Sequence, residues 1–281
     1  MATTNPQHIF PGKLLILAPH MDDEVLACGG TIAQLPQKER IQVVYATDGA
    51  MSPVPSGGLS DLPPEALPDI RIKEALEAMG RLGVPAANLH FWGFPDARLQ
   101  DYAAPLRRRL GDLIDELQPD QLLVPFRYDR HPDHLALHRA ALAVAEGLER
   151  PEIVEYFVYY RWQLLPGKDL RRFIPPEKLW PVDISGQAEL KQQALQCYRS
   201  QTTCFYPWQT RAILPPARVE EVSRDPEIFL RYDTRQPGAA VFDRARTWIR
   251  LVHRLEPRLK VWKDRLLHRS RKNGVPDGSA A

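Results

Sequence analysis

The sequence predicts an α/β protein: a Rossmann-like, mostly parallel sheet with helices on both faces, followed by a basic helical extension at the C-terminus. Apolar runs of strand length alternate with helical patterns along most of the chain, without internal repeats, as in parallel sheets. Several of these runs end in short polar turns. In open α/β sheets such turns lie at the carboxyl edge and carry the chemistry.

The expected elements follow one another in a regular order. Strands are expected at 14–18, 41–46, 89–92, 121–126, 152–160 and 178–184, and helices from about 23 onward and at 69–83, 102–117, 134–148 and 186–199. The helix at 69–83 is amphipathic, with Asp69 expected as its N-cap and Gly83 just past its end. The proline-rich stretch 51–68 is longer than most connections, as functional loops tend to be.

The composition is ordinary for a soluble globular protein, with 44% hydrophobic and 26% charged residues among 281. The net charge of +2 gives no reason to expect a nucleic-acid partner. Three cysteines without metal-type spacing indicate reduced thiols. The first twelve residues lack a signal-peptide pattern, and no apolar run approaches the roughly 20 residues that span a bilayer. We therefore expect a cytoplasmic protein.

The turn after the first expected strand carries His20 and three consecutive carboxylates, Asp22, Asp23 and Glu24. Imidazole nitrogen and carboxylate oxygen are ligands that Zn²⁺ accepts. Adjacent carboxylates on a turn point in different directions, so one can bind a metal while the other faces its bound water. Acidic residues also favour helix N-termini for electrostatic reasons alone. This turn by itself does not distinguish a metal site from an acidic helix N-terminus.

A second polar turn, His131-Pro132-Asp133-His134, follows the strand expected at 121–126. If both strands lie in one sheet, both turns open onto the same edge. One histidine can then supply a third metal ligand while the other faces the substrate, and Asp133 can orient an imidazole and raise its basicity. Two such turns at matching places favour a His-carboxylate-His metal site over an N-cap beside incidental histidines.

The two motifs resemble those of the LmbE-like (PIG-L) deacetylases, zinc enzymes that remove the N-acetyl group from N-acetylglucosamine conjugates. The family's first motif usually reads A/P-H-P-D-D-E, and Met21 replaces its proline here. The resemblance covers about residues 13–205 and includes three further matches: Arg71-x-x-Glu74 before Leu82-Gly83, Phe94-Pro95-Asp96, and Ser200-Gln201.

The resemblance implies a site for one Zn²⁺ ion, with three ligands: His20, Asp23 and His134. It implies that Asp22 is the general base, and that protonated His131 stabilises the oxyanion or acts as the acid. A zinc ion with three protein ligands keeps an open position for water, whose pKa it lowers towards about 7. Acetate would leave after the hydroxide attacks the acetamide carbonyl and a proton returns to the amine.

For the substrate, the resemblance implies a small-molecule or lipid-linked acetylated amino sugar, with Arg71 and Asp96 at positions that hold sugar hydroxyls. Two other classes stay open: a metal-dependent hydrolase of another amide or of a phosphoester, and a non-catalytic sugar-binding homologue. The sequence contains no second ligand set, no glycine-rich phosphate loop and no G-x-S-x-G motif. The oligomeric state, homo-oligomers included, also stays open.

The expected organisation has five parts: an N-terminal arm (1–12), a deacetylase domain (13–205), a proline-rich extension (206–240), a basic amphipathic helical tail (241–273) and a disordered end (274–281). In the tail, tryptophan and leucine recur at helical spacing among many arginines and lysines, and Pro257 is expected to divide it into two helices. The pattern fits a helix packed on the core or on a second copy of the chain. It also fits a helix on the anionic inner face of a membrane.

Overall fold

A computed structural model of the chain describes residues 3–53, 66–159, 169–224 and 226–233. The chain divides into two units, one of residues 1–160 and 176–233 and one of residues 161–175 and 234–281. In the second unit, the described residues form the short 3-10 helix Leu170–Phe173, capped by Asp169, whose Oδ1 accepts a hydrogen bond from Arg171 N at 2.9 Å. Apart from residues 169–175, the described residues belong to the first unit.

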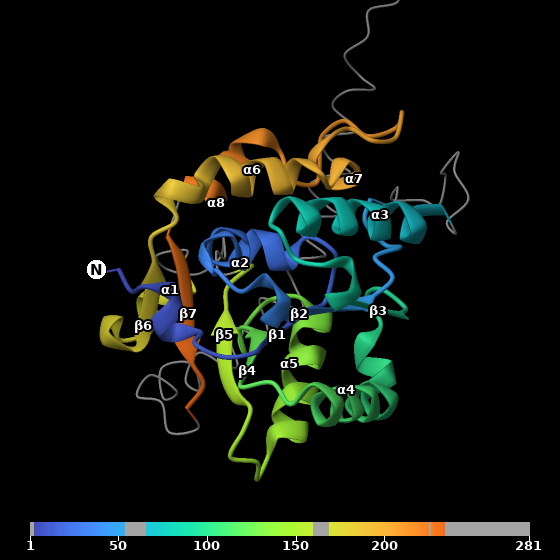
Figure 1. Ribbon diagram of the computed structural model, residues 1–281. Coiled ribbons are helices and arrows are strands. Elements are labelled where there is room, and N and C mark those ends of the chain that lie inside the picture. Colours follow the sequence, from blue (N-terminus) through green and yellow to red (C-terminus); the bar gives the residue numbers. More distant parts are fainter. Residues whose placement is uncertain (1–2, 54–65, 160–168, 225, 234–281) are drawn as a thin grey trace, which may run out of the picture. The chain divides into compact units, whose positions relative to one another are not determined.

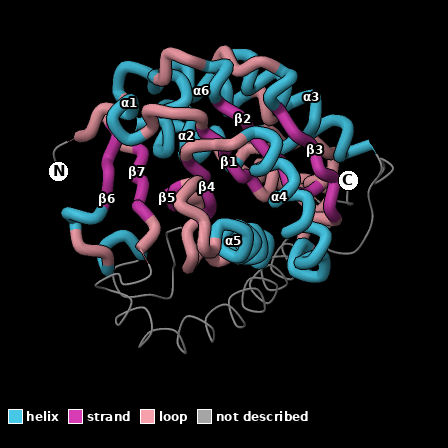
Figure 2. Tube along the Cα trace, turned by 60° about the horizontal axis from the view of Figure 1, so that its bottom comes forward, coloured by secondary structure: helices cyan, strands magenta, loops and turns pink. Residues whose placement is uncertain are grey.

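The described residues of the first unit form a seven-stranded sheet with the order β3-β2-β1-β4-β5-β7-β6. Figure 2 shows the strands side by side in this order. Five strands are parallel: β1 (Leu14–Ala18), β2 (Ile41–Thr47), β3 (Leu89–Phe94), β4 (Gln121–Pro125) and β5 (Glu152–Tyr156). β7 (Glu227–Arg231) pairs antiparallel with β5, and β6 (Leu179–Val182) pairs antiparallel with β7.

Helices cover both faces of the sheet (Figure 1). One face carries α2 (Asp23–Gln34), α3 (Ala66–Arg81), α6 (Ala188–Gln196) and α8 (Pro216–Arg224); the other carries α4 (Ala103–Leu117) and α5 (Pro132–Ala145). Two short helices, α1 (Pro6–Ile9) and α7 (Arg199–Thr202), complete the set. Successive residues of β1 supply opposite layers, since Ile16 packs in one apolar cluster and Leu17 in the other. The fold class predicted from the sequence is confirmed.

Some element boundaries differ from the expectation. Helix α3 begins at Ala66, so Asp69 lies in its first turn and is not its N-cap. Gly83 does end it: its φ is 81°, and its N–H donates to Gly80 O at 3.1 Å. The segment expected to be a proline-rich extension contains α8 and β7, and β7 lies between β5 and β6. The sheet therefore continues past residue 205.

The strand order changes direction at the centre of the sheet. From β1 the chain proceeds outward to β2 and β3, and it then returns to β4 on the other side of β1. β1 and β4 pair directly in parallel, with Leu14 opposite Gln121 and Ile16 opposite Leu123. Ligands of open α/β sheets bind at such a switch point, outside the carboxyl ends of the strands. The two polar turns follow these two strands, so the expectation that they share one edge is confirmed.

No helix within the described ranges is long and apolar enough to cross a bilayer. The tail expected at 241–273 and the end at 274–281 lie outside the described residues, as does much of the loop expected at 51–68.

The alternatives for the tail predict opposite results in liposome sedimentation. For an interfacial helix, each basic residue near an anionic surface contributes about 1 kcal/mol. The full chain should then sediment with anionic liposomes at low salt, and truncation after Gly238 should leave a stable protein that no longer does so. For a helix packed on the core or on a second copy, truncation should lower the melting temperature. Absence of liposome binding by the full chain at low salt rules out the membrane alternative.

Candidate active site

The turn after β1 is held by the side chain of Asp23. Its Oδ2 accepts a hydrogen bond from the main-chain N–H of His20 at 3.0 Å, and α2 begins at Asp23 itself. The preceding residue, Asp22, has φ 144° and ψ −24°, a main-chain conformation that residues other than glycine rarely adopt. The unusual conformation turns two consecutive carboxylates to different surroundings: Asp22 towards Arg71, and Asp23 towards two imidazoles.

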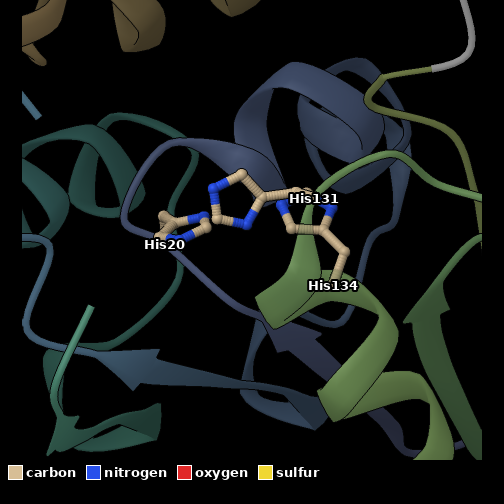
Figure 3. A group of neighbouring side chains, drawn as sticks. All are labelled: His20, His131 and His134. Atoms are coloured by element: carbon tan, nitrogen blue, oxygen red, sulfur yellow. The ribbon is translucent and has the colours of Figure 1, made fainter. Parts of the chain in front are cut away.

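The three expected metal ligands meet at one point. Asp23 Oδ2 lies 3.1 Å from His20 Nδ1 and 3.2 Å from His134 Nε2, and all three residues are buried. Figure 3 shows His20 reaching in from the turn after β1, while His131 and His134 come from the start of α5. The switch point of the sheet therefore brings together residues that are more than a hundred positions apart in the sequence.

Three atoms of this group lack a hydrogen bond of good geometry among the described residues. They are Asp23 Oδ1 and both ring nitrogens of His134, all buried. A buried polar atom without a partner costs free energy, which a bound cation removes. Nitrogen and oxygen donors in this number are what zinc takes in sites that keep one position open. The side chains therefore fit a zinc ion.

The other nitrogen of each imidazole faces a carboxylate. His134 Nδ1 lies 3.2 Å from Asp129 Oδ2, and His20 Nε2 lies 3.1 Å from Asp96 Oδ1 and 3.3 Å from Asp133 Oδ2. Such partners fix the ring orientation and tautomer of metal-binding histidines. Asp133 was expected to orient an imidazole. It lies against His20, while its distance to His131 Nδ1 is 4.0 Å.

Asp129 is a site residue that the sequence analysis missed. Main-chain N–H groups hold both of its oxygens, with His131 N donating to Oδ1 at 2.8 Å and Tyr159 N donating to Oδ2 at 3.2 Å. The available signal was a carboxylate two residues before His131, inside the same polar turn.

The acidic surroundings shift the pKa of both buried histidines. Burial acts to lower the pKa of His134, but the charges of Asp129 and Asp23 outweigh it and raise the value to about 9. Burial likewise opposes protonation of His20, whose hydrogen bonds with Asp133, Asp23 and Asp96 raise its pKa well above the usual value. Imidazoles that hold protons this firmly release them when a metal binds.

The groups expected to handle protons show opposite shifts. Burial raises the pKa of Asp22 to about 7, although the nearby charge of Arg71 acts to lower it. Burial, reinforced by His20 and His134, lowers the pKa of His131 to about 4. His131 Nδ1 accepts a hydrogen bond from Asp133 N at 3.3 Å, so a neutral ring carries its proton on Nε2. The imidazolium that the sequence analysis expected is therefore not needed for His131 to donate a hydrogen bond.

The two residues expected to hold sugar hydroxyls are engaged within the protein. Arg71 is 1% exposed; its Nη2 donates to Met21 O and lies 3.5 Å from Asp22 Oδ2. Asp96 accepts a hydrogen bond from Met51 N at 3.0 Å besides its contact with His20. Their contact with a sugar stays a prediction.

Residues 15–145, which contain both polar turns, match the family described as GlcNAc-PI de-N-acetylase (PIG-L). The chain is 31% identical over 199 residues to a probable N-acetyl-alpha-D-glucosaminyl L-malate deacetylase 2 of Bacillus cereus, covering 67% of this chain and 83% of that protein. The chain belongs to the PIG-L family. A diacetylchitobiose deacetylase of Thermococcus kodakarensis is 30% identical over 200 residues, covering 67% of this PIG-L chain and 70% of the relative.

A solved structure agrees with the fold. The N,N'-diacetylchitobiose deacetylase from Pyrococcus horikoshii superposes with a TM-score of 0.57 at 24% identity, covering 85% of this chain and 88% of that one. The segment that matches the PIG-L family contains every expected metal ligand, but it ends before α6, α7 and β7.

Proposed function

We propose that this PIG-L protein is a zinc-dependent hydrolase that removes the N-acetyl group from a conjugate containing an N-acetylhexosamine. The observation that carries the proposal is the approach of His20 Nδ1 and His134 Nε2 to one oxygen of Asp23, with Asp22 beside them. The names of the relatives support the reaction, since both are deacetylases of acetylated amino sugars. Arg71 and Asp96 are the candidates for contact with the sugar.

Two side chains beside the proposed ligands have separate tasks in the reaction: Asp22 transfers protons, and His131 stabilises the developing negative charge. His20, Asp23 and His134 would hold the zinc ion, which would supply Lewis-acid chemistry by lowering the pKa of a water molecule and polarising a carbonyl. Asp22 accepts the proton of the attacking water, a task that suits a carboxylate with a pKa of about 7. His131 donates a hydrogen bond from Nε2 to the carbonyl oxygen as negative charge develops. Asp22 then gives this proton to the leaving amine, and acetate and the free amino sugar separate.

Assays of acetate and phosphate release separate this proposal from its alternatives. We expect the purified protein to release acetate from an N-acetylglucosamine conjugate, to lose this activity with a chelator, and to regain it with zinc. Phosphate release from model phosphoesters would indicate a phosphoesterase instead. Sugar binding without release of either product would indicate a non-catalytic homologue.

Asp129 provides a test of the metal site through a residue that does not bind the ion. Because its carboxylate faces His134 Nδ1 at 3.2 Å, Asp129→Asn should weaken zinc binding about 10–100-fold. Competition with a chromogenic chelator measures this affinity. Asp120→Asn is a control, since Asp120 lies at the opposite edge of the sheet and accepts a hydrogen bond from Lys13 N. An unchanged affinity in Asp129→Asn would mean that this contact does not support the ligand.

A further inference from the structure

The main chain at Asp22 is held in a conformation that must be stabilised by its surroundings. Among the described residues, those other than glycine with a positive φ are Asp22, Ala97 and Gln118. At 144°, the φ of Asp22 lies far outside the small left-handed region that such residues tolerate. Strain of this kind persists where neighbouring contacts over-determine the backbone, and it is frequent at functional sites.

The peptide group between Met21 and Asp22 is hydrogen-bonded at both of its ends. Its carbonyl oxygen, Met21 O, accepts a hydrogen bond from Arg71 Nη2. Its N–H, on Asp22, donates to Glu24 Oε2 at 3.1 Å. The φ angle of Asp22 describes rotation about its N–Cα bond, which turns the Asp22 side chain relative to the plane of the Met21–Asp22 peptide. Contacts that fix the peptide plane therefore help to fix φ, and with it the direction of the Asp22 carboxylate.

Glu24 is itself held by two hydroxyls from other parts of the fold. Its Oε1 accepts hydrogen bonds from Tyr45 Oη, at 3.0 Å, and from Tyr198 Oη. Tyr45 belongs to β2, and Tyr198 directly precedes α7. Glu24 and both tyrosines are fully buried. Within the described ranges, two groups of side chains could bind a metal ion, His20 with His131 and His134, and His20 with Asp96 and Asp133; Glu24 belongs to neither.

We propose that Glu24, held by Tyr45 and Tyr198, is a positioning residue that fixes the Met21–Asp22 peptide and so aims the Asp22 carboxylate. This inference rests on the proposed function for the reaction that Asp22 serves. It assigns a role to Tyr198, which lies beyond the segment that matches the PIG-L family. Arg71 completes the arrangement from the carbonyl side of the same peptide.

The first test measures the strain through stability and needs no activity. Asp22→Gly should melt about 2–4 °C above Asp22→Ala, because glycine adopts this φ freely. The pair is then compared in a background with Glu24→Met, Tyr45→Phe and Tyr198→Phe. This background removes the network as a whole, since losing one partner alone would leave buried polar groups unpaired. With the peptide released, the glycine advantage should fall by more than half.

Gln118 is the matched control for this comparison. It caps α4 with φ 47° and has no described contact with Glu24. Gln118→Gly should also melt above Gln118→Ala, and that difference should be the same in both backgrounds. A purely structural network would lower every melting temperature and leave the glycine advantage at position 22 unchanged, which would overturn the proposal.

The second test uses kinetics and a single conservative variant, which also serves if the triple background does not fold. Tyr198→Phe should retain its zinc and its KM while kcat falls about tenfold or more, as expected for a misdirected proton acceptor. An unchanged kcat would overturn the positioning role. If the wild-type protein releases no acetate, the proposed function fails, while the melting comparison still decides whether Glu24 fixes this peptide.

Discussion

His134→Ala is expected to lose its zinc and at least about a hundredfold in the rate of acetate release. Replacing a partner behind a metal-binding histidine costs 10–100-fold in affinity or activity, so loss of the ligand itself costs more. His134 is fully buried, and its Nε2 faces Asp23 Oδ2 at 3.2 Å, at the position proposed for the ion. Because its loss also leaves the buried carboxylates of Asp23 and Asp129 without an imidazole partner, the melting temperature is measured beside the metal content. Elemental analysis for zinc and an acetate assay on the same sample measure both effects.

His138→Gln is the matched control for this prediction. His138 lies one turn further along α5, is buried, and contacts Pro125 O through Nδ1 at 2.8 Å. It should keep about one zinc per chain and normal turnover. Full zinc occupancy in His134→Ala would show that a different side chain supplies the third ligand.

Asp22→Asn is expected to keep zinc but to lose about 10²–10⁴-fold in kcat, the usual contribution of a general base. Asparagine has the same shape and size as aspartate, so the turn after β1 should be retained. Because the interaction that is lost belongs to the transition state, KM should change little. Steady-state kinetics with zinc analysis of the same preparation makes the measurement.

Asp101→Asn is the control for charge removal, because Asp101 is exposed and pairs with Arg98 at 3.0 Å on the surface. Its activity should equal that of the wild type. Near-normal turnover in Asp22→Asn would remove Asp22 as the base, whatever the result for the metal.

The parallel part of the fold could be predicted from the sequence because its signals are local. The strand from Leu14 to Ala18 is an uninterrupted apolar run, and the polar turns after β1 and β4 mark the edge at which the site lies. β7 could not be predicted in the same way. It is short, follows a proline-rich stretch, and enters the sheet antiparallel between two strands that come earlier in the chain. Such pairing depends on partners that are far apart in the sequence.

The candidate site shows the same division. The resemblance of two short motifs implied His20, Asp23 and His134 as metal ligands, and the structure brings these three side chains together. The carboxylates that contact these histidines were predicted less well. Asp133 faces His20, 113 residues away, and this pairing follows from the register of β1 and β4, which no local pattern records. The role of Glu24 likewise depends on Tyr198, which is 174 residues distant.

The most direct test of the central claim is the position of the metal ion in crystals of the protein loaded with zinc. An anomalous difference map at the zinc edge should show one peak between His20 Nδ1, Asp23 and His134 Nε2. Two groups of described side chains have donor atoms close enough together to hold an ion. One, His20 with His131 and His134, shares two residues with this position; the second place is the other face of His20, where Asp96 and Asp133 lie within 3.3 Å of Nε2. A single peak at that second place, with none beside Asp23 and His134, would contradict the proposed metal site and the chemistry built on it.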